Sequence, residues 1–215
     1  MTYRPPYFRI DDRTELLHVI SAHPLAMLVT AHDGDLSLTH LPLLARVEDD
    51  AVFLEGHIAR ANDQWKHQPS AAVAAFQIAG HYISPTWYPS KRTNPRTVPT
   101  YDYVAVEARG SIRFIQDAQW LYAFTRRLTE SQELRVSGTW SVDDAPADYV
   151  ESQVKAIVGV EMRVETLTGT FKLNQNHPRE NIDSVIASLE ALGTADSAAL
   201  ASFMRAHAIA NDRAT

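Results

Sequence analysis

The sequence predicts an α+β fold built around an antiparallel β-barrel, and three observations support this prediction. About six or seven β-rich segments follow one another, and several are joined by turns containing Asp-Gly or paired acidic residues. Helical periodicity is concentrated toward the two ends of the chain. The chain has 215 residues, of which 45% are hydrophobic and 21% charged, enough for a full core. Segregated helices beside antiparallel strands indicate an α+β barrel.

The first part of the chain is expected to form a short helix and then a meander of three strands. Residues 12–22 place leucine, valine and isoleucine close to helical spacing and are followed by a His-Pro stop. Residues 25–30 and 36–44 are β-rich and flank an Asp-Gly turn, which predicts a hairpin. A second acidic turn then leads into residues 51–58, which give the third strand.

The middle of the chain is expected to contain a helical turn over 59–67 and a long irregular loop over 89–100, where three prolines interrupt regular structure. Three further strands are predicted at 71–78, 81–88 and 103–115. The last of these carries a glycine in its interior, which indicates a bend. Loops as long as the proline-rich one are usually functional or mobile.

The final part of the chain changes period from strand to helix and back. Asp117 is predicted to cap one helix, and residues 147–157 form a second. Residues 158–173 return to strand, with a Thr-Gly turn signal near their end. Two amphipathic helices, at about 180–192 and 196–209, follow and are separated by Gly-Thr.

Composition excludes several classes of protein. The sequence contains no cysteine, which excludes disulfides, cysteine-ligated zinc, iron–sulfur clusters and thiol catalysis. The N-terminal segment is polar and does not resemble a signal peptide. No apolar run approaches the about 20 residues of a membrane span. We therefore expect a cytoplasmic protein without a membrane segment.

The net charge of −6 opposes binding to nucleic acid. The densest basic group is Lys91, Arg92 and Arg96, in the proline-rich loop. No helix-turn-helix with a basic recognition helix is visible. Contact with DNA is therefore expected to be weak or indirect.

Motifs for metal, nucleotide and nucleophilic chemistry are absent from the sequence. His32, His40 and His57 lie on or beside predicted strands, but their spacing matches no metal motif, so no metal site is predicted. There is no P-loop, GxGxxG or GxSxG motif, and the 8 glycines offer no phosphate cradle. No catalytic residue can be named on this basis.

A phosphorylated cofactor would have to be held by side chains. The best candidate is the segment from Gly56 to Asn62, where a strand end and a helical turn offer backbone amides beside the guanidinium of Arg60. Lys172 and Gln175 end the last predicted strand and could meet a phosphate or carbonyls. Four aromatic residues flank the proline-rich loop and could cover a planar ring: Trp87, Tyr88, Tyr101 and Tyr103.

Seven ordered motifs carry a resemblance to a known family. They are MTYRPPYF, LVT followed by THLPLL, GHIARANDQW, YISPTWYPSK, VPTYDY, SVDDAPADYV with AIVG, and FKLNQN. Together they resemble the PaiB-like family of FMN-binding negative transcriptional regulators. The resemblance runs to about residue 192, so we expect a domain over 1–192 and a helical tail over 193–215.

This resemblance implies an antiparallel split β-barrel with flanking helices, related to pyridoxamine-phosphate oxidases and flavin reductases. It also implies FMN as cofactor and a homodimer with flavin at the subunit interface. It places Thr39, His40 and Leu41 near the isoalloxazine, and His57, Arg60 and Asn62 near the phosphate. Lys172 and Gln175 would come from the neighbouring subunit.

The chain departs from the family pattern at four positions. Tyr101 and Asp102 stand where the family usually has Trp-Asn, Glu107 where it has His, and Asn174 where it more often has Ser. Three functions stay open: an FMN-dependent negative regulator of transcription, an FMN oxidoreductase of small molecules, and a flavin-carrying interaction module.

Overall fold

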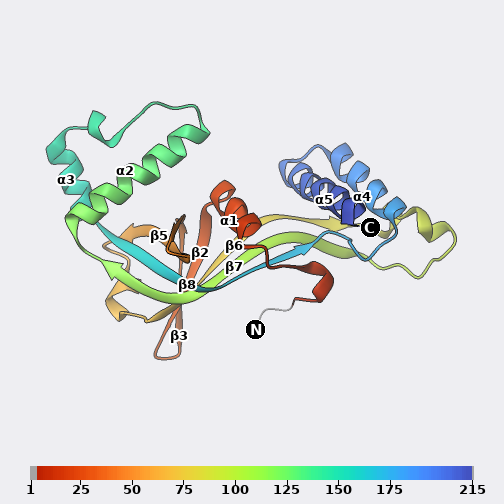
Figure 1. Ribbon diagram of the computed structural model, residues 1–215, viewed down its shortest axis with the longest axis horizontal. Coiled ribbons are helices and arrows are strands. Elements are labelled where there is room, and N and C mark those ends of the chain that lie inside the picture. The colour runs from red at the N-terminus through yellow and green to blue at the C-terminus, as the bar shows by residue number, and fades with distance from the viewer. Residues whose placement is uncertain (1–3, 215) are drawn as a thin grey trace. The chain divides into compact units, whose positions relative to one another are not determined.

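The computed structural model describes residues 4–214, and side chains up to residue 208. Their contacts divide the chain into two compact units. The terminal unit comprises residues 4–12, 77–106 and 168–214, and the hairpin unit comprises residues 13–76 and 107–167. Three long strands, β6 (Ala71–Ile83), β7 (Thr100–Ile115) and β8 (Ile157–Lys172), contribute residues to both units (Figure 1).

The strands form one sheet in the order β3-β2-β6-β7-β8-β5-β4, and the pairings of β2 with β3 and β6 and of β5 with β4 and β8 are antiparallel. The shorter members are β1 (Arg9–Ile10), which pairs with β8, and β2 (Leu25–His32), β3 (Asp35–Pro42), β4 (Leu44–Glu48) and β5 (Ala51–Ala59). The predicted meander is wrong, because β5 pairs with β8 rather than with β3. Leu43 separates β3 from β4. Its buried side chain and its N–H, which donates to the Pro24 carbonyl at 2.9 Å, interrupt the strand expected over 36–44.

The two predicted turns form tight hairpins. In the β2–β3 turn, Asp33 and Gly34 have φ angles of 49° and 89°, and in the β4–β5 turn, Asp49 and Asp50 have 45° and 67°. Positive φ at both central residues matches the right-handed twist of the flanking strands. The β2–β3 hairpin is therefore confirmed.

Two predicted interruptions of strands are wrong. Residues 71–78 and 81–88 were expected to form separate strands, but β6 runs without a break through Gly80 to Ile83. A Cβ at Gly80 would lie 3.1 Å from the Tyr101 ring, so the glycine permits close packing and does not end the strand. The Thr-Gly signal near residue 168 is likewise extended, because Gly169 pairs with Ile10 of β1. Strand pairing overrides the local turn preference at both places.

The helices of the hairpin unit are α1 (Arg13–Ala22), α2 (Ala118–Arg135) and α3 (Ala147–Lys155). The predicted cap is confirmed, since the Asp117 carboxylate accepts from the N–H of Trp120 at 2.7 Å. Leu121 and Phe124 on α2 are buried in the core.

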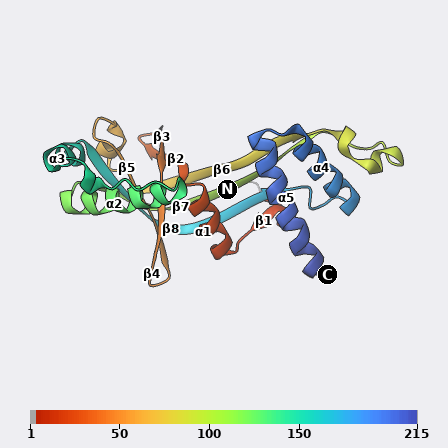
Figure 2. The ribbon, with the colours of Figure 1, turned by 90° about the horizontal axis from the view of Figure 1, so that it is seen from above.

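The terminal unit contains α4 (Arg179–Leu192) and α5 (Ala195–Ala214), which pack against each other (Figure 2). Leu189 of α4 and Leu200 and Met204 of α5 are all buried. The predicted tail helix therefore contributes to the core of this unit, and the boundary at residue 193 falls in the turn between the two helices.

Short 3-10 helices complete the chain: η1 (Pro6–Phe8), η2 (Asp63–His67), η3 (Pro85–Trp87), η4 (Pro89–Arg92) and η5 (Val142–Asp144). The helical turn expected over 59–67 corresponds to η2. Among the described residues, no helix combines the length and the apolar character that crossing a bilayer requires.

Candidate functional site

A hydrogen-bonded cluster of polar side chains connects β3 with η2 in the hairpin unit. The Asn62 amide donates to the Thr39 hydroxyl at 2.7 Å, and that hydroxyl donates to the Gln64 carbonyl oxygen at 2.6 Å. Asn62 also caps η2 by accepting from the N–H of Gln64 at 3.0 Å. Gln64 is buried and donates onward to Thr30. Two predicted site residues, Thr39 and Asn62, are thus brought together, and Gln64 joins them as a residue that sequence reasoning missed.

Leu41 and His40 point to opposite sides of β3. Side chains alternate along a strand, so Thr39 and Leu41 share one face and His40 lies on the other. Leu41 is buried, whereas His40 is exposed. The polar Thr39 and the apolar Leu41 therefore lie on one face of β3, and the imidazole of His40 lies on the opposite face.

His57 on β5 carries a polar atom that has no hydrogen-bond partner among the described residues. Its Nδ1 is buried, and its ring meets Phe124 edge-on at a centroid distance of 5.9 Å. Burial lowers the pKa of His57, so the imidazole is neutral near pH 7. A buried, neutral ring nitrogen without a partner is suited to a hydrogen bond with a ligand.

Arg60 lies just beyond β5, and its guanidinium is held by the end of α3. Its Nε donates to the Lys155 carbonyl at 2.7 Å and its Nη2 to the Ile157 carbonyl at 3.0 Å, while Nη1 donates to Gln116 at 2.8 Å. A guanidinium has five N–H donors, so two remain for another partner. Arg60 therefore joins β5 to the α3–β8 junction and keeps part of its hydrogen-bonding capacity.

Lys172 and Gln175 belong to the terminal unit, where both contact their own chain. The Lys172 ammonium donates to the Thr100 hydroxyl and, at 2.7 Å, to the Tyr101 carbonyl. The Gln175 side chain accepts from the N–H of Leu173 at 2.7 Å and donates to the Phe171 carbonyl, which fixes the chain beyond β8.

Asp102 forms the centre of a buried polar cluster that sequence reasoning did not assign. Its carboxylate is 0% exposed, lies 3.5 Å from the Lys172 ammonium, and makes no hydrogen bond with the described residues. Burial raises the pKa of Asp102 to about 7, against the opposing effect of Lys172. Nearby, Asn174 has a φ of 60° and a buried amide nitrogen without a partner, and its carbonyl oxygen accepts from the Tyr88 hydroxyl at 3.4 Å.

Sequence signals for this cluster did exist. Asp102 and Asn174 are two of the four positions at which the chain departs from the pattern of the family it resembles.

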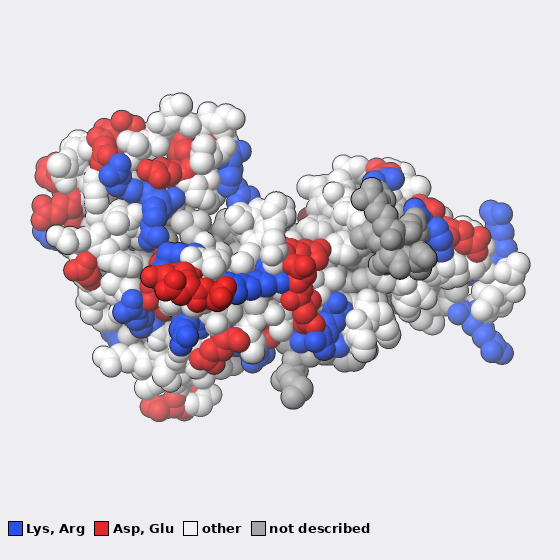
Figure 3. All heavy atoms as spheres, viewed as in Figure 1, with Lys and Arg blue, Asp and Glu red and all other residues white. Residues whose placement is uncertain are grey.

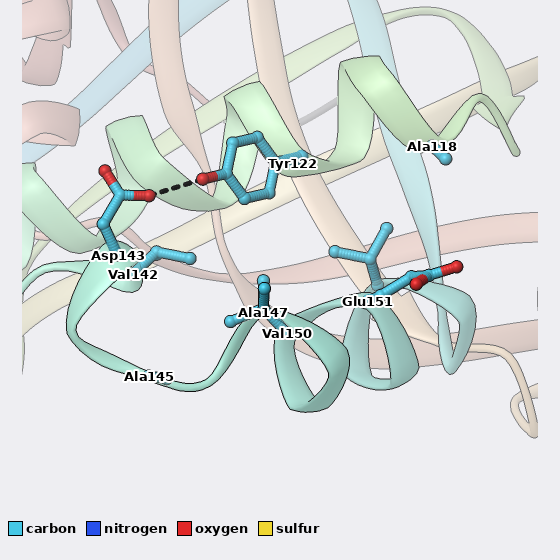
Figure 4. Close-up of a pocket in the computed structure, with 9 residues that line it drawn as sticks. Ala118, Tyr122, Val142, Asp143, Ala145, Ala147, Val150 and Glu151 are labelled. Carbon is cyan, nitrogen blue, oxygen red and sulfur yellow. Dashed lines mark hydrogen bonds between the residues drawn. The ribbon is translucent and has the colours of Figure 1, made fainter.

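A hollow of about 260 Å³ lies between α2 and α3 in the hairpin unit (Figure 4). Tyr122 on α2 donates to Asp143 at 2.5 Å across one side of it, and Val150 and Val154 of α3 contribute apolar surface. None of the predicted site residues lines this hollow.

Comparison with known proteins gives the family. A family model described as "Putative FMN-binding domain" matches residues 2–166. The chain belongs to this family. It is 30% identical over 191 residues to the protease synthase and sporulation protein PAI 2 of Bacillus subtilis, with 87% of this chain and 89% of that protein covered. Membership of this PaiB-like family confirms the resemblance, and the cofactor of the chain is FMN.

Solved structures confirm the fold. The flavocytochrome Anf3 from Azotobacter vinelandii is similar with a TM-score of 0.57 and 14% identity, covering 85% of this chain and 78% of that one. An FAD and heme binding protein from Mycobacterium smegmatis has a TM-score of 0.56 and 13% identity, covering 82% and 80%. The fold is thus the predicted antiparallel split β-barrel with flanking helices.

Proposed function

We propose that the protein is a cytoplasmic, homodimeric regulator of PaiB type that binds FMN without a covalent link. The observation that carries this proposal is the buried Nδ1 of His57 on β5, which has no hydrogen-bond partner among the described residues. Asn62 and Gln64 of the Thr39–Asn62–Gln64 cluster follow this strand in the chain. Buried polar atoms are nearly always hydrogen-bonded, so this nitrogen calls for a ligand group. PAI 2, a relative named for protease synthesis and sporulation, supports a regulatory role.

The residues of the hairpin unit fit the chemistry of FMN. His57, Asn62 and the free donors of Arg60 are suited to phosphate and ribityl oxygens, which accept hydrogen bonds. Leu41 is a buried apolar side chain and Thr39 carries a hydroxyl on the same face of β3, and His40 would act on the opposite face. When bound, FMN supplies the capacity to accept and donate electrons. The protein residues would hold its phosphate and exclude water from its ring.

Lys172 and Gln175 enter the proposal through the second subunit. We assign them to the flavin site of the partner, as the family resemblance implies. Release of Lys172 from its contacts with Thr100 and Tyr101 would free an ammonium for the partner's flavin.

Regulation is proposed to act without tight contact between this protein and DNA. The net charge is −6, and acidic and basic side chains are interspersed over the face drawn in Figure 3. A duplex-binding surface concentrates Lys and Arg on one face or along one helix. The state of the bound FMN would therefore affect transcription through a protein partner or through weak contact with DNA.

Three measurements on the purified protein test this proposal. We expect a flavin visible spectrum whose chromophore is released on denaturation, a dimer by light scattering, and no tight sequence-selective complex in a mobility-shift assay at physiological salt. A His57→Phe variant keeps the apolar bulk of the ring and should bind FMN about fivefold more weakly, since one hydrogen bond contributes about 1 kcal/mol. A colourless protein that does not take up FMN, or a monomer at micromolar concentration, would contradict the proposal.

A second function, an FMN oxidoreductase, is favoured by Asp102. A carboxyl with a pKa near 7 can exchange a proton at physiological pH, which is a property of general acids and bases. This function predicts that NADPH bleaches the bound flavin much faster than free FMN, and that Asp102→Asn slows the reaction. Equal rates for bound and free FMN would leave only the regulatory function.

A further inference from the structure

The proline-rich loop forms one wall of an open pocket in the terminal unit. The pocket has a volume of about 350 Å³ and lies between η3, η4 and α4. Its lining includes two aromatic rings, two cations and two hydroxyls: Trp87, Tyr88, Lys91, Arg92, Thr86 and Ser184. Small-molecule sites in proteins have about this size, from roughly 300 to 1,000 Å³, and combine aromatic surface with a few polar groups.

The two cations of the pocket are not neutralised by the protein. Lys91 and Arg92 are exposed, and neither forms an ion pair within the described part of the chain. Basic side chains stand out at the loop between β6 and β7 (Figures 1 and 3), although the chain as a whole carries a charge of −6. A local positive charge on an acidic protein attracts a small anion.

The aromatic wall is held in a fixed position. Tyr88 is buried, its ring stacks on His177 at a centroid distance of 4.8 Å, and its hydroxyl donates to Asn174. Trp87 is half-buried at the pocket. Trp87 offers flat apolar surface on which a planar ligand can stack, and the buried Tyr88 forms a rigid part of the pocket wall.

A buried residue of α4 fixes the cationic segment. The Asn181 carbonyl oxygen accepts from the N–H of Ser90 at 3.2 Å, and its amide donates to the Ser90 hydroxyl at 2.8 Å. Ser90 immediately precedes Lys91 and Arg92, and its carbonyl accepts from the N–H of Asn94 at 2.9 Å. Because this tether orders the backbone before a ligand arrives, less entropy is lost on binding.

The structure assigns this pocket to a small aromatic anion, such as an aryl carboxylate, as a second ligand besides FMN. The Trp87 ring would stack on the planar part and the two cations would meet the charged group. A nucleic acid is less well matched, since specific duplex binders make about 6–10 phosphate contacts. The loop offers Lys91 and Arg92 at the concave site, and its third cation, Arg96, does not line the pocket.

The experiment uses the FMN-saturated full-length protein, so that the probe cannot occupy the flavin site. Isothermal titration with 1-naphthoate is compared with the uncharged 1-naphthalenemethanol, which keeps the rings. We expect naphthoate to bind at least about tenfold more tightly than the alcohol. The double variant Lys91→Met with Arg92→Met should lose this difference while its flavin absorbance stays unchanged. Arg96→Met is the matched control, because it removes a cation of the same loop that does not line the pocket.

Several results would overturn this assignment. One is equal affinity for the acid and the alcohol in the wild-type protein, which would show that charge is not recognised. Another is unchanged naphthoate binding in the double variant. A third is duplex DNA binding more tightly than naphthoate, with Arg96→Met as damaging as the double variant, which would indicate an extended nucleic-acid surface.

Asn181→Ala should weaken naphthoate binding without changing the preference for the acid, since it loosens the loop but keeps both cations.

Discussion

The buried carboxylates of the two units differ in how well they are paired with cations. In the hairpin unit, Glu55 accepts from Arg46 at 2.7 Å and from Arg127 at 2.9 Å, so both of its oxygens are paired. Glu161 is likewise shared by Arg113 at 2.6 Å and Arg46 at 3.2 Å. In the terminal unit, Asp102 is at least as buried, but within the described residues its carboxylate forms an ion pair with the Lys172 ammonium alone, at 3.5 Å.

From this difference we infer a structural role for Glu55 and Glu161 and a functional role for Asp102. Glu55 and Glu161 each contact two guanidiniums. Such a buried ion-pair network, once formed, stabilises the fold against loss of one partner. An uncompensated carboxylate raises the free energy of the folded state and persists at functional sites. We therefore expect substitutions in the hairpin network to destabilise the protein and a substitution at Asp102 to stabilise it.

The largest loss of stability is expected for Arg46→Met, which removes the guanidinium shared by both glutamates. Glu55 and Glu161 would each keep one arginine but lose the donor to one buried oxygen. Breaking a buried ion pair from one side costs about 3–5 kcal/mol, and we expect the lower end because each carboxylate keeps a partner. Urea unfolding followed by tryptophan fluorescence measures this loss.

Arg163→Met is the matched control on β8. Arg163 is exposed and forms no ion pair within the described part of the chain, so its loss should change the free energy of unfolding by less than about 0.5 kcal/mol. If Arg46→Met costs no more than this control, the network does not stabilise the fold and the contrast between the units fails.

Asp102→Asn tests the other side of the comparison. The pKa of Asp102 is about 7 in the folded protein, whereas the ordinary value for an aspartate is 3.8. Between these values the folded state keeps a proton that the unfolded state has lost, so the stability of the wild type falls as pH rises from about 4 to 7. The amide has no charge to bury. Asp102→Asn should therefore be more stable above pH 7, by at most about 4 kcal/mol, since one pKa unit corresponds to about 1.4 kcal/mol.

The pH profile distinguishes this effect from a general change of packing. The gain in unfolding free energy should vanish near pH 4, where Asp102 is protonated in both states. Tyr88 lies beside Asp102, and burial raises the pKa of its hydroxyl above the ordinary value of 10.0, so the hydroxyl stays neutral over this range. Asp50→Asn in the exposed β4–β5 turn should show no such profile. A gain that is constant from pH 4 to pH 8 would refute a titrating Asp102.

Local patterns predicted the elements of the fold better than their pairing. The Asp-Gly turn and the Asp117 cap depend on a few neighbouring residues, and the structure contains both. The pairing of β5 with β8 depends on residues about a hundred positions apart, which no local pattern reports. For the same reason, the sequence predicted a break between the strands 71–78 and 81–88 and a turn signal at the Thr-Gly pair in β8, whereas neighbours in space keep both segments extended.

The candidate site shows the same limit. Thr39, Asn62 and His57 could be named from the family motifs, and Thr39 and Asn62 meet in one hydrogen-bonded cluster. Gln64 was missed because its role depends on burial beside Thr30. Sequence position likewise could not show that the donors of Arg60 already hold the end of α3.

The smallest effect is expected for Arg60→Ala, because part of the hydrogen-bonding capacity of Arg60 is already used within the hairpin unit. If Arg60 uses its free donors on the FMN phosphate, Arg60→Ala should weaken FMN about 10- to 100-fold, because charge-assisted bonds contribute about 1.5–3 kcal/mol. Riboflavin has no phosphate and should lose little affinity. The ratio of the two affinities, measured by flavin fluorescence titration, isolates the phosphate contact from damage to the α3–β8 junction. Gln116→Ala removes one acceptor of Arg60 and keeps the guanidinium, so it should leave the ratio unchanged. An unaltered ratio in Arg60→Ala would make Arg60 a purely structural link, and the phosphate would then be held by His57 and Asn62 without a cation from the hairpin unit.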